Sequence, residues 1–324
     1  MRTVMKLACC ALAMAVFALP FAAGTVGAAE GKKVKIGVCL PNLNIPHWVF
    51  MKWKYEQDAA ANNVDLTFVQ ADGYENVEKQ INLVQDFISA EMDAIIIAAV
   101  DAQALVNVIG RAVDAGIPVI EVNNLTRSDR SYVKIKSDDY EMGRRQAGLM
   151  NKALGGKGKV VMINAPGGTT LAVRGQGFRE TVEKEYPGIE ILAEQFVPSD
   201  PARCTAVMED FIQTYPEMNG VFCWSDTAGI AAASVATAQS SQITITAMDA
   251  NNIALRDFIR AGVIYGTVAQ QPMVLAHLSF EYALKAVRGE DNPVKNVFAD
   301  IIDVTGDNIA GVDYSGILRT GDKW

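Results

Sequence analysis

The stretch Lys33-Val-Lys-Ile-Gly-Val-Cys-Leu-Pro-Asn-Leu-Asn-Ile-Pro-His-Trp48 joins an apolar run to a loop of polar and aromatic residues. A short apolar run that ends at Pro and Asn predicts a buried strand, and the residues after Trp48 predict a helix. Further along the chain, Ala269-Gln-Gln-Pro272 ends another such strand and opens another helix. The same order of strand, polar loop and helix recurs between these two stretches.

Strand and helix candidates alternate over most of the chain, and the set occurs twice, before and after about residue 137. Alternation of this kind predicts an α/β fold with parallel sheets covered by helices on both faces. A chain of this length also favours two domains. The predicted strands span 34–40, 64–70, 94–99, 118–122, 133–136, 160–164, 190–196, 220–224, 243–248 and 265–268. The predicted helices span 48–62, 77–90, 102–115, 142–153, 175–185, 202–214, 227–239, 253–261 and 272–288.

The N-terminal residues 1–29 predict a signal peptide and therefore a periplasmic or secreted protein. Arg2 and Lys6 precede an uncharged, Ala-rich stretch that ends in small residues, so cleavage is expected after Ala28 or Ala29. A retained membrane anchor is the alternative, which Pro20 and the many small residues disfavour. The pair Cys9-Cys10 precedes most of the apolar stretch, whereas a lipidated cysteine should follow it.

Charge and cysteine content exclude two classes of protein. The whole chain has 29 Lys and Arg against 37 Asp and Glu, and loss of the leader brings the formal net charge to about −10. A chain with an excess of acidic residues does not predict the basic surface with which proteins bind the phosphates of nucleic acid. Three cysteines remain after the leader, and an odd number does not form a disulfide framework. Cys204 and Cys223 are expected at the same end of one sheet, so a disulfide between them and three buried thiols are both left open.

Polar residues that directly follow the predicted strands are the candidates for binding. In parallel α/β sheets, ligands lie beyond the carboxyl ends of the strands. The residues at these positions are mostly Asn, Gln, Ser and single carboxylates, which suit hydroxyl groups, and Trp48 offers a flat apolar surface for a sugar ring. The candidate ligand-binding residues are Asn42, Asn44, His47, Trp48, Asn123, Asn124, Arg174, Trp224, Ser225, Asp226, Asp249 and Gln270.

Several of these candidates have a structural alternative. Asp226 and Asp249 both precede helices and are suited to capping, an assignment that we favour slightly for Asp226. Arg174 is expected to brace the second lobe, with Glu180 on the same helix as its neighbour. The glycine-rich loop at 165–170 lacks the Gly-Lys-Ser/Thr ending of a phosphate-binding P-loop. A metal site is not expected at His47, because it is a lone histidine and zinc needs three or four clustered ligands, and His277 is expected to be structural.

The order and spacing of these strand-end motifs resemble the periplasmic ribose-binding protein family, the type I solute-binding proteins of ABC sugar importers. The resemblance runs from Lys33 to about Asp303. It rests on Asn44-Ile-Pro-His-Trp48, Gly116-Ile-Pro-Val-Ile120 with the polar pair after it, Ser137-Asp138, Arg174-Gly-Gln-Gly-Phe178, Ser225-Asp226, Met248-Asp249 and Gln270. No single motif is specific, and the conclusion rests on their common order.

The resemblance implies two similar Rossmann-like lobes joined by a three-strand hinge, which close on a ligand. Carried over, the N-terminal lobe comprises 30–137 plus 271–301 and the C-terminal lobe 138–270 plus 302–324. It also implies capture of a small neutral hydroxylated ligand, delivery to the permease of an ABC transporter, a monomeric state, and no cofactor. The aromatic loop would stack on the sugar, while the pair at Asn123-Asn124 and the positions of Ser225, Asp249 and Gln270 would bind its hydroxyls.

The chain departs from the ribose-binding pattern at charged and aromatic positions. An Asp-Arg pair of the family is Asn123-Asn124 here, and a ligand-binding Arg is Ala172. One aromatic of the first wall is His47, and an aromatic of the second lobe is Ser199, for which Trp224 or Phe196 could substitute. We therefore expect a polyol, another sugar or a small cyclic signal in place of ribose.

Other classes of function are weighed by what the chain contains. A sensory receptor that presents its closed form to a chemoreceptor or histidine kinase is the main alternative, because the same ligand-binding fold would serve it. A periplasmic carbohydrate-active enzyme is disfavoured, because no nucleophile motif is present, although Asp226 and Asp249 could form a carboxylate pair in space. A transcription regulator would carry a DNA-binding segment where this chain has its leader.

Overall fold

The computed structural model describes residues 32–165 and 170–318. The predicted signal peptide and most of the glycine-rich loop at 165–170 therefore lie outside the described residues. Within the described ranges, no helix is both long and apolar enough to cross a membrane.

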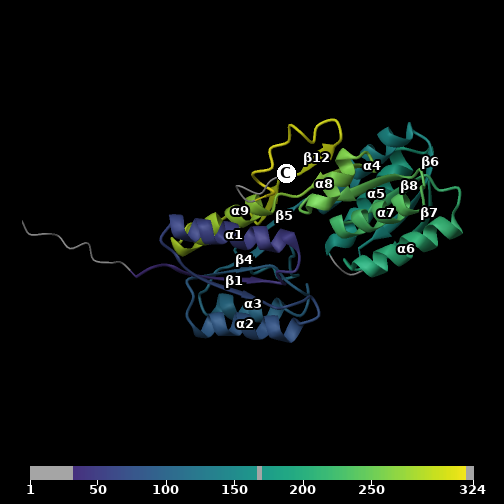
Figure 1. Cartoon of the computed structure of the whole chain (residues 1–324). Coiled ribbons are helices and arrows are strands. Elements are labelled where there is room, and N and C mark those ends of the chain that lie inside the picture. The colour runs from purple at the N-terminus through teal and green to yellow at the C-terminus, as the bar shows by residue number, and fades with distance from the viewer. Residues whose placement is uncertain (1–31, 166–169, 319–324) are drawn as a thin grey trace, which may run out of the picture. The chain divides into compact units, whose positions relative to one another are not determined.

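Two six-stranded sheets form the framework (Figure 1). The first has the order β11-β5-β4-β3-β1-β2 and is parallel throughout. The second has the order β12-β10-β9-β8-β6-β7 and is parallel except for β12, which pairs antiparallel with β10. The first sheet comprises β1 (Lys35–Leu40), β2 (Asp65–Gln70), β3 (Ala94–Ile97), β4 (Val119–Val122), β5 (Val133–Ser137) and β11 (Asn296–Ala299). The second comprises β6 (Gly158–Asn164), β7 (Ile189–Phe196), β8 (Gly220–Cys223), β9 (Thr244–Met248), β10 (Ile264–Ala269) and β12 (Ile302–Thr305).

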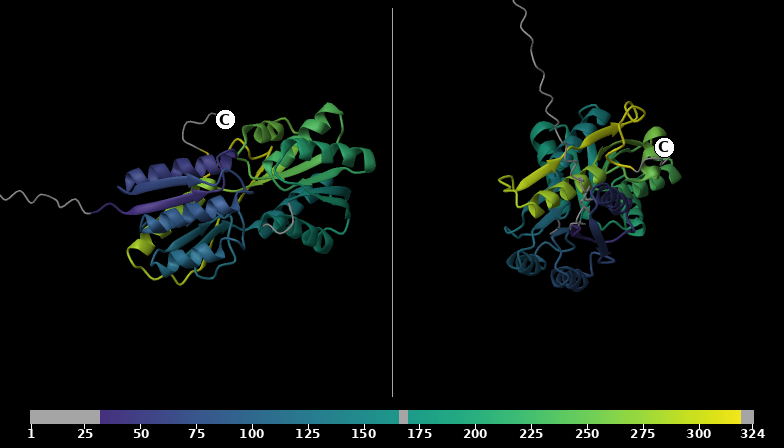
Figure 2. Two further views of the ribbon diagram at one scale, coloured as in Figure 1. Left: turned by 90° about the horizontal axis from the view of Figure 1, so that it is seen from below. Right: turned by 90° about the vertical axis from the view of Figure 1, so that its left-hand side faces the viewer.

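Helices cover both faces of the first sheet (Figure 2). Successive side chains of its strands point to opposite faces and pack in two apolar clusters. Ile96 packs in the cluster with α1 and α9, whereas Ile95 and Ile97 pack in the cluster with α2 and α3. Burial on both faces explains why these strands are continuous apolar runs. The helices are α1 (Pro46–Ala61), α2 (Val77–Ser89), α3 (Val106–Asp114), α4 (Asp139–Leu154), α5 (Val173–Glu185), α6 (Pro201–Thr214), α7 (Asp226–Ala238), α8 (Ile253–Arg260) and α9 (Pro272–Val287).

The chain passes between the two sheets three times. After β5 of the first sheet it continues into α4, which packs on β9 and β10 of the second sheet. After β10 it returns with α9, which packs on α1 and on β3 to β5 of the first sheet. It passes again between β11 and β12, which belong to different sheets. We refer below to each sheet with its covering helices as the first and the second lobe.

Two glycines allow a close approach of α4 and α5 in the second lobe. A Cβ on Gly143 would lie 1.9 Å from the backbone oxygen of Arg174, and one on Gly177 would lie 2.2 Å from that of Tyr140. No other residue fits at this distance. The crossing fixes the start of α5 and with it the position of Arg174.

The structure confirms the predicted α/β fold of two parallel-sheet lobes. All ten predicted strands are present, with ends that differ from the prediction by two residues or fewer. Two short strands, β11 and β12, were not predicted as separate elements. They are four residues each, lie close together without a helix between them, and β11 is largely exposed.

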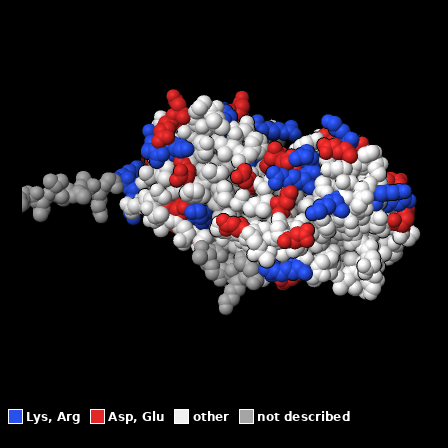
Figure 3. Space-filling view, turned by 90° about the horizontal axis from the view of Figure 1, so that it is seen from above, with Lys and Arg blue, Asp and Glu red and all other residues white. Residues whose placement is uncertain are grey.

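On the face shown in Figure 3, basic and acidic side chains are interspersed. No large patch of one sign is visible on this face.

Candidate functional site

A cavity of about 530 Å³ is lined by strand-end loops of both lobes. Its volume lies in the range of pockets for small molecules. Eleven of the twelve predicted residues line it: Asn42, Asn44, His47, Trp48, Asn123, Asn124, Arg174, Trp224, Ser225, Asp249 and Gln270. Asp226 is not among the lining residues. Side chains that are up to 228 positions apart, from Asn42 to Gln270, thus line one cavity beyond the ends of the strands.

Aromatic side chains from both lobes flank the cavity. Trp48 packs edge to face with His47, at 4.8 Å between ring centroids and 84° between planes. From the second lobe, the indole nitrogen of Trp224 donates to the carbonyl of Val197 at 3.0 Å, which fixes the ring. Ser199 also lines the cavity, whereas Phe196 does not and is 57% exposed. Trp224 therefore supplies the aromatic surface of this lobe.

His47 is buried and held neutral. Burial lowers its pKa to about 4, although Asp249 nearby favours the charged form. Its Nδ1 lies 3.4 Å from the amide nitrogen of Asn251, and its Nε2 is buried with no partner among the described residues. If Nδ1 accepts from Asn251, Nε2 carries the proton and is a hydrogen-bond donor for a ligand.

The pair after β4 is held in a fixed arrangement. Asn123 has φ +59°, a left-handed conformation that Asn tolerates. Its amide nitrogen donates to the side-chain oxygen of Asn124 at 3.0 Å, and Asn124 in turn donates to the hydroxyl of Tyr74 at 3.4 Å. Tyr74 lines the cavity and was missed by the sequence reasoning, although it directly follows the Ala71–Gly73 loop at the end of β2.

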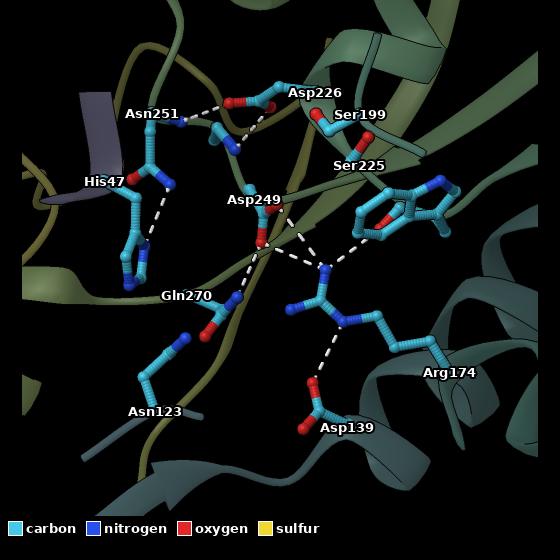
Figure 4. Close-up of polar contacts among 12 residues, drawn as sticks. His47, Asn123, Asp139, Arg174, Ser199, Ser225, Asp226, Asp249, Asn251 and Gln270 are labelled. Atoms are coloured by element: carbon cyan, nitrogen blue, oxygen red, sulfur yellow. Dashed lines mark hydrogen bonds and ion pairs between the residues drawn. The ribbon is translucent and has the colours of Figure 1, made fainter. Parts of the chain in front are cut away.

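Arg174 forms a charged network at the second-lobe side of the cavity (Figure 4). Its Nε donates to Asp139 at 2.9 Å, and its Nη1 donates to the carbonyl of Trp224 at 2.9 Å and to Asp249 at 3.3 Å. Asp249 also accepts from Gln270 at 2.7 Å. Burial disfavours the charge on Arg174, but the two carboxylates outweigh it and its pKa is raised.

This network corrects the expected neighbour of Arg174. Arg174 does brace the lobe, but through Asp139 and Asp249, while Glu180 accepts from Tyr140 and Gln176 instead. The two acidic partners lie 35 and 75 residues away in sequence, where helix spacing gives no hint of them.

Asp226 and Ser225 have different roles at the start of α7. The hydroxyl of Ser225 caps the helix by accepting from the backbone of Ala228 at 3.3 Å. The carboxylate of Asp226 accepts from the backbone N–H groups of Ala250, Asn251 and Asn252. Burial and the neighbouring Asp249 raise its pKa well above the usual range, against these three bonds.

The side chains that line the cavity provide groups that can bind a ligand. Asp226 is engaged with backbone amides outside the lining, so Asp226 and Asp249 do not form a carboxylate pair facing one ligand. Within the described ranges, no three His, Cys, Asp or Glu side chains cluster so as to hold a metal ion. Amides, a hydroxyl, one carboxylate and two indoles can together bind hydroxyl groups and an apolar ring face.

Cys39, Cys204 and Cys223 are buried free thiols. Burial raises the pKa of Cys39 to about 12 and that of Cys204 to about 11. The structure therefore has no disulfide between Cys204 and Cys223, the pairing that the sequence left open.

Comparisons with known proteins add to this geometry. A family model described as a periplasmic binding protein domain matches residues 36–291. The chain is 26% identical over 260 residues to the ribose import binding protein of Bacillus subtilis (strain 168), covering 80% of this chain and 83% of that protein. It is 28% identical over 254 residues to the xylitol-binding protein of Mycolicibacterium smegmatis, covering 78% and 71%. An ABC transporter solute-binding protein from Agrobacterium vitis, solved with alpha-D-tagatopyranose, has a TM-score of 0.79 and 25% identity, covering 86% of this chain and 97% of that one.

Proposed function

We propose that this chain, which belongs to the periplasmic binding protein family, captures a small neutral sugar or polyol in its cavity and delivers it to an ABC importer. The family confirms the resemblance found in the sequence and implies a periplasmic location. The relatives named above are a ribose import binding protein and a xylitol-binding protein, which agrees with the predicted receptor and not with an enzyme.

The observation that carries the proposal is the set of polar strand ends that both lobes present to one cavity beside Trp48 and Trp224. A sugar or polyol needs directed donors and acceptors for its hydroxyls, and a ring gains from packing on an indole. The proteins named for xylitol and solved with tagatopyranose support this ligand class.

The charges of the cavity favour a neutral ligand. The charge of Arg174 is already compensated by Asp139 and Asp249, and Asn123 and Asn124 are uncharged. No cation is thus left uncompensated among these groups to bind a carboxylate or a phosphate. Desolvating such an anion without a partner would be unfavourable.

We further propose lobe boundaries at 30–137 plus 271–301 and at 138–270 plus 302–324, with closure about the three passages of the chain. The assignment of β11 and β12 to different sheets supports the passage near residue 301. A ligand that binds both lobes would favour the closed form by its differential affinity for the two states. Small-angle X-ray scattering with and without ligand tests this, and an unchanged profile at saturation would contradict it.

The leader of residues 1–29 is proposed to be removed on export. Intact mass measurement of the protein from the periplasmic fraction should give a chain that starts at Ala29 or Glu30. A full-length mass in the membrane fraction would instead indicate a retained anchor.

Ligand binding is tested by a thermal-shift screen of residues 30–324 after unfolding and refolding to remove any bound ligand. The panel comprises pentoses, hexoses, polyols, nucleosides, amino acids and furanone-type signals. A ligand at 100 times its Kd should stabilise the fold by about 2.7 kcal/mol. Hits among sugars or polyols support the proposal, whereas hits only among nucleosides or amino acids contradict the ligand class.

The variants Asp249→Asn and Trp48→Ala show whether a hit binds in the cavity. Each should weaken the hit by at least about tenfold, since each removes a lining group. His277→Asn is the matched control on the surface of α9. Equal affinity of all variants would place the ligand elsewhere.

The membrane partner and the oligomeric state are also open to direct measurement. We propose a monomer that serves a permease, and light scattering tests the mass. Crosslinking of the liganded protein in membranes, followed by mass spectrometry, separates a permease from the chemoreceptor or sensor kinase of the alternative hypothesis.

A further inference from the structure

The loop between β9 and α8 has an unusual backbone. Asp249 has φ +82° and Ala250 has φ +96°, two consecutive residues in a region that side chains other than glycine rarely adopt. Ala250 is fully buried, and its methyl group cannot hydrogen-bond to the backbone as Asn or Asp can. Something outside the loop must therefore hold this conformation.

Asp226 holds it from the start of α7. One carboxylate oxygen accepts from the N–H of Ala250 at 2.8 Å, and the other accepts from Asn251 at 2.9 Å and from Asn252 at 3.0 Å. Three successive amides of the loop thus donate to one carboxylate, and Figure 4 shows the bond from Asn251 to Asp226.

The loop carries two side chains toward the cavity region. Asp249 lines the cavity and accepts from Gln270 and Arg174. The amide nitrogen of Asn251 lies 3.4 Å from Nδ1 of His47, which belongs to the first lobe. The oxygen of Asn251 is buried with no partner among the described residues. The position of this loop therefore affects a binding carboxylate and a contact between the lobes.

We propose that Asp226 is a positioning residue that holds the strained loop in its binding geometry and so sets ligand affinity without touching the ligand. The inference rests on the proposed function only in taking Asp249 as a ligand contact. Asp226 thus has neither of the roles considered from the sequence, since Ser225 caps the helix and Asp226 lies outside the lining.

The test compares Asp226→Asn with a matched control in the other lobe. Asn keeps the shape of Asp, but its amide group turns one acceptor into a donor that faces backbone N–H groups. Asp101→Asn is the control, because Asp101 also accepts from two successive backbone amides, Gln103 and Ala104, and does not line the cavity. Both variants are made in the full exported protein.

Hydrogen exchange measures the stability of the loop, and calorimetry measures ligand binding at the site. In NMR hydrogen exchange without ligand, the amides of residues 250–252 should exchange at least about tenfold faster in Asp226→Asn, while amides in the centre of β9 remain as in the parent. In calorimetry, the sugar or polyol found by the screen should bind at least about tenfold more weakly to Asp226→Asn and unchanged to Asp101→Asn.

A second substitution separates positioning from general damage to the fold. Ala250→Gly removes the conformational penalty at φ +96°, so the loop needs less support from Asp226. Asp226→Asn combined with Ala250→Gly should bind within about threefold of Ala250→Gly alone. Urea unfolding of the parent and the three variants shows whether a change in binding merely follows a change in the free energy of unfolding.

The outcomes distinguish this inference from the proposed function. Faster exchange of the loop amides in a protein that binds no member of the panel would support the role of Asp226 in holding the loop and contradict the sugar proposal. Sugar binding by the parent with unchanged exchange and unchanged Kd in Asp226→Asn would overturn the inference. A weakened Kd that Ala250→Gly does not restore would also overturn it.

Discussion

Acidification should destabilise this protein through His47, and replacement of His47 by Asn should remove that effect. His47 is 5% exposed, and burial lowers its pKa from 6.5 to about 4. Burial and the charge of Arg174 oppose protonation of His47, whereas Asp249 and Asn123 favour it. In the unfolded chain the same imidazole is solvated and titrates normally.

The sign and size follow from the two pKa values. Between pH 7 and 5 the unfolded chain takes up a proton at this position while the folded protein does not, so the unfolded state gains stability. Linkage gives a loss of about 2 kcal/mol in the free energy of unfolding over this interval, and the loss levels off below the folded pKa of about 4. The contribution is fully present only above pH 6.5.

Urea unfolding at pH 7.0 and 5.0 measures the effect in the parent, His47→Asn and His277→Asn. The parent and His277→Asn should lose about 2 kcal/mol more than His47→Asn, whose amide oxygen can still accept from Asn251 without titrating. Apart from His277, which His277→Asn lacks, the other titrating groups are common to the three proteins and cancel in the comparison. Equal losses in the three proteins would refute the reasoning and show that His47 is exposed to solvent in the resting protein.

Two further predictions concern the stability of the second lobe. Arg174→Met should lower the free energy of unfolding by about 3–5 kcal/mol, because it leaves Asp139, at 3% exposure, with only the more distant Lys136 at 4.0 Å as an ion-pair partner. Urea unfolding of the ligand-free protein checks this, and a change under about 1 kcal/mol would show that the Arg174–Asp139 pair does not contribute to stability. Gly143→Ala should cost about 3 kcal/mol, since its Cβ would meet backbone at 1.9 Å. Gly148→Ala on the same helix, where the nearest atom is 3.6 Å away, is the control and should stabilise slightly; similar effects of both substitutions would count against the close helix crossing.

Most of the fold was predictable because each buried strand is a continuous apolar run followed by a polar loop. Residues 95–97 illustrate this, since all are Ile and all are fully buried. The expectation that a ligand lies beyond the carboxyl ends of parallel strands also placed His47, Asn123 and Asp249 in one site, because it depends only on topology.

The remaining features depend on contacts that local pattern does not encode. β11 and β12 are strands because they pair with β5 and β10, which are far away in sequence, and many of their own side chains are only partly buried. The role of Asp226 depends on the backbone of a loop 24 to 26 residues later. A carboxylate at a helix start is common, and only the position of the loop amides reveals what it holds.

The three passages of the chain also determine the order in which the protein can be completed during synthesis. The first lobe's core includes Leu275 and Phe280 of α9, which pack on α1, yet α9 is made after the whole of 138–270. A nascent chain that has emerged as far as residue 270 therefore still lacks the helix that covers Met51 and Tyr55. Final folding of the lobe that begins first must wait for one of the last elements, which extends the time during which the growing polypeptide is a substrate for chaperones.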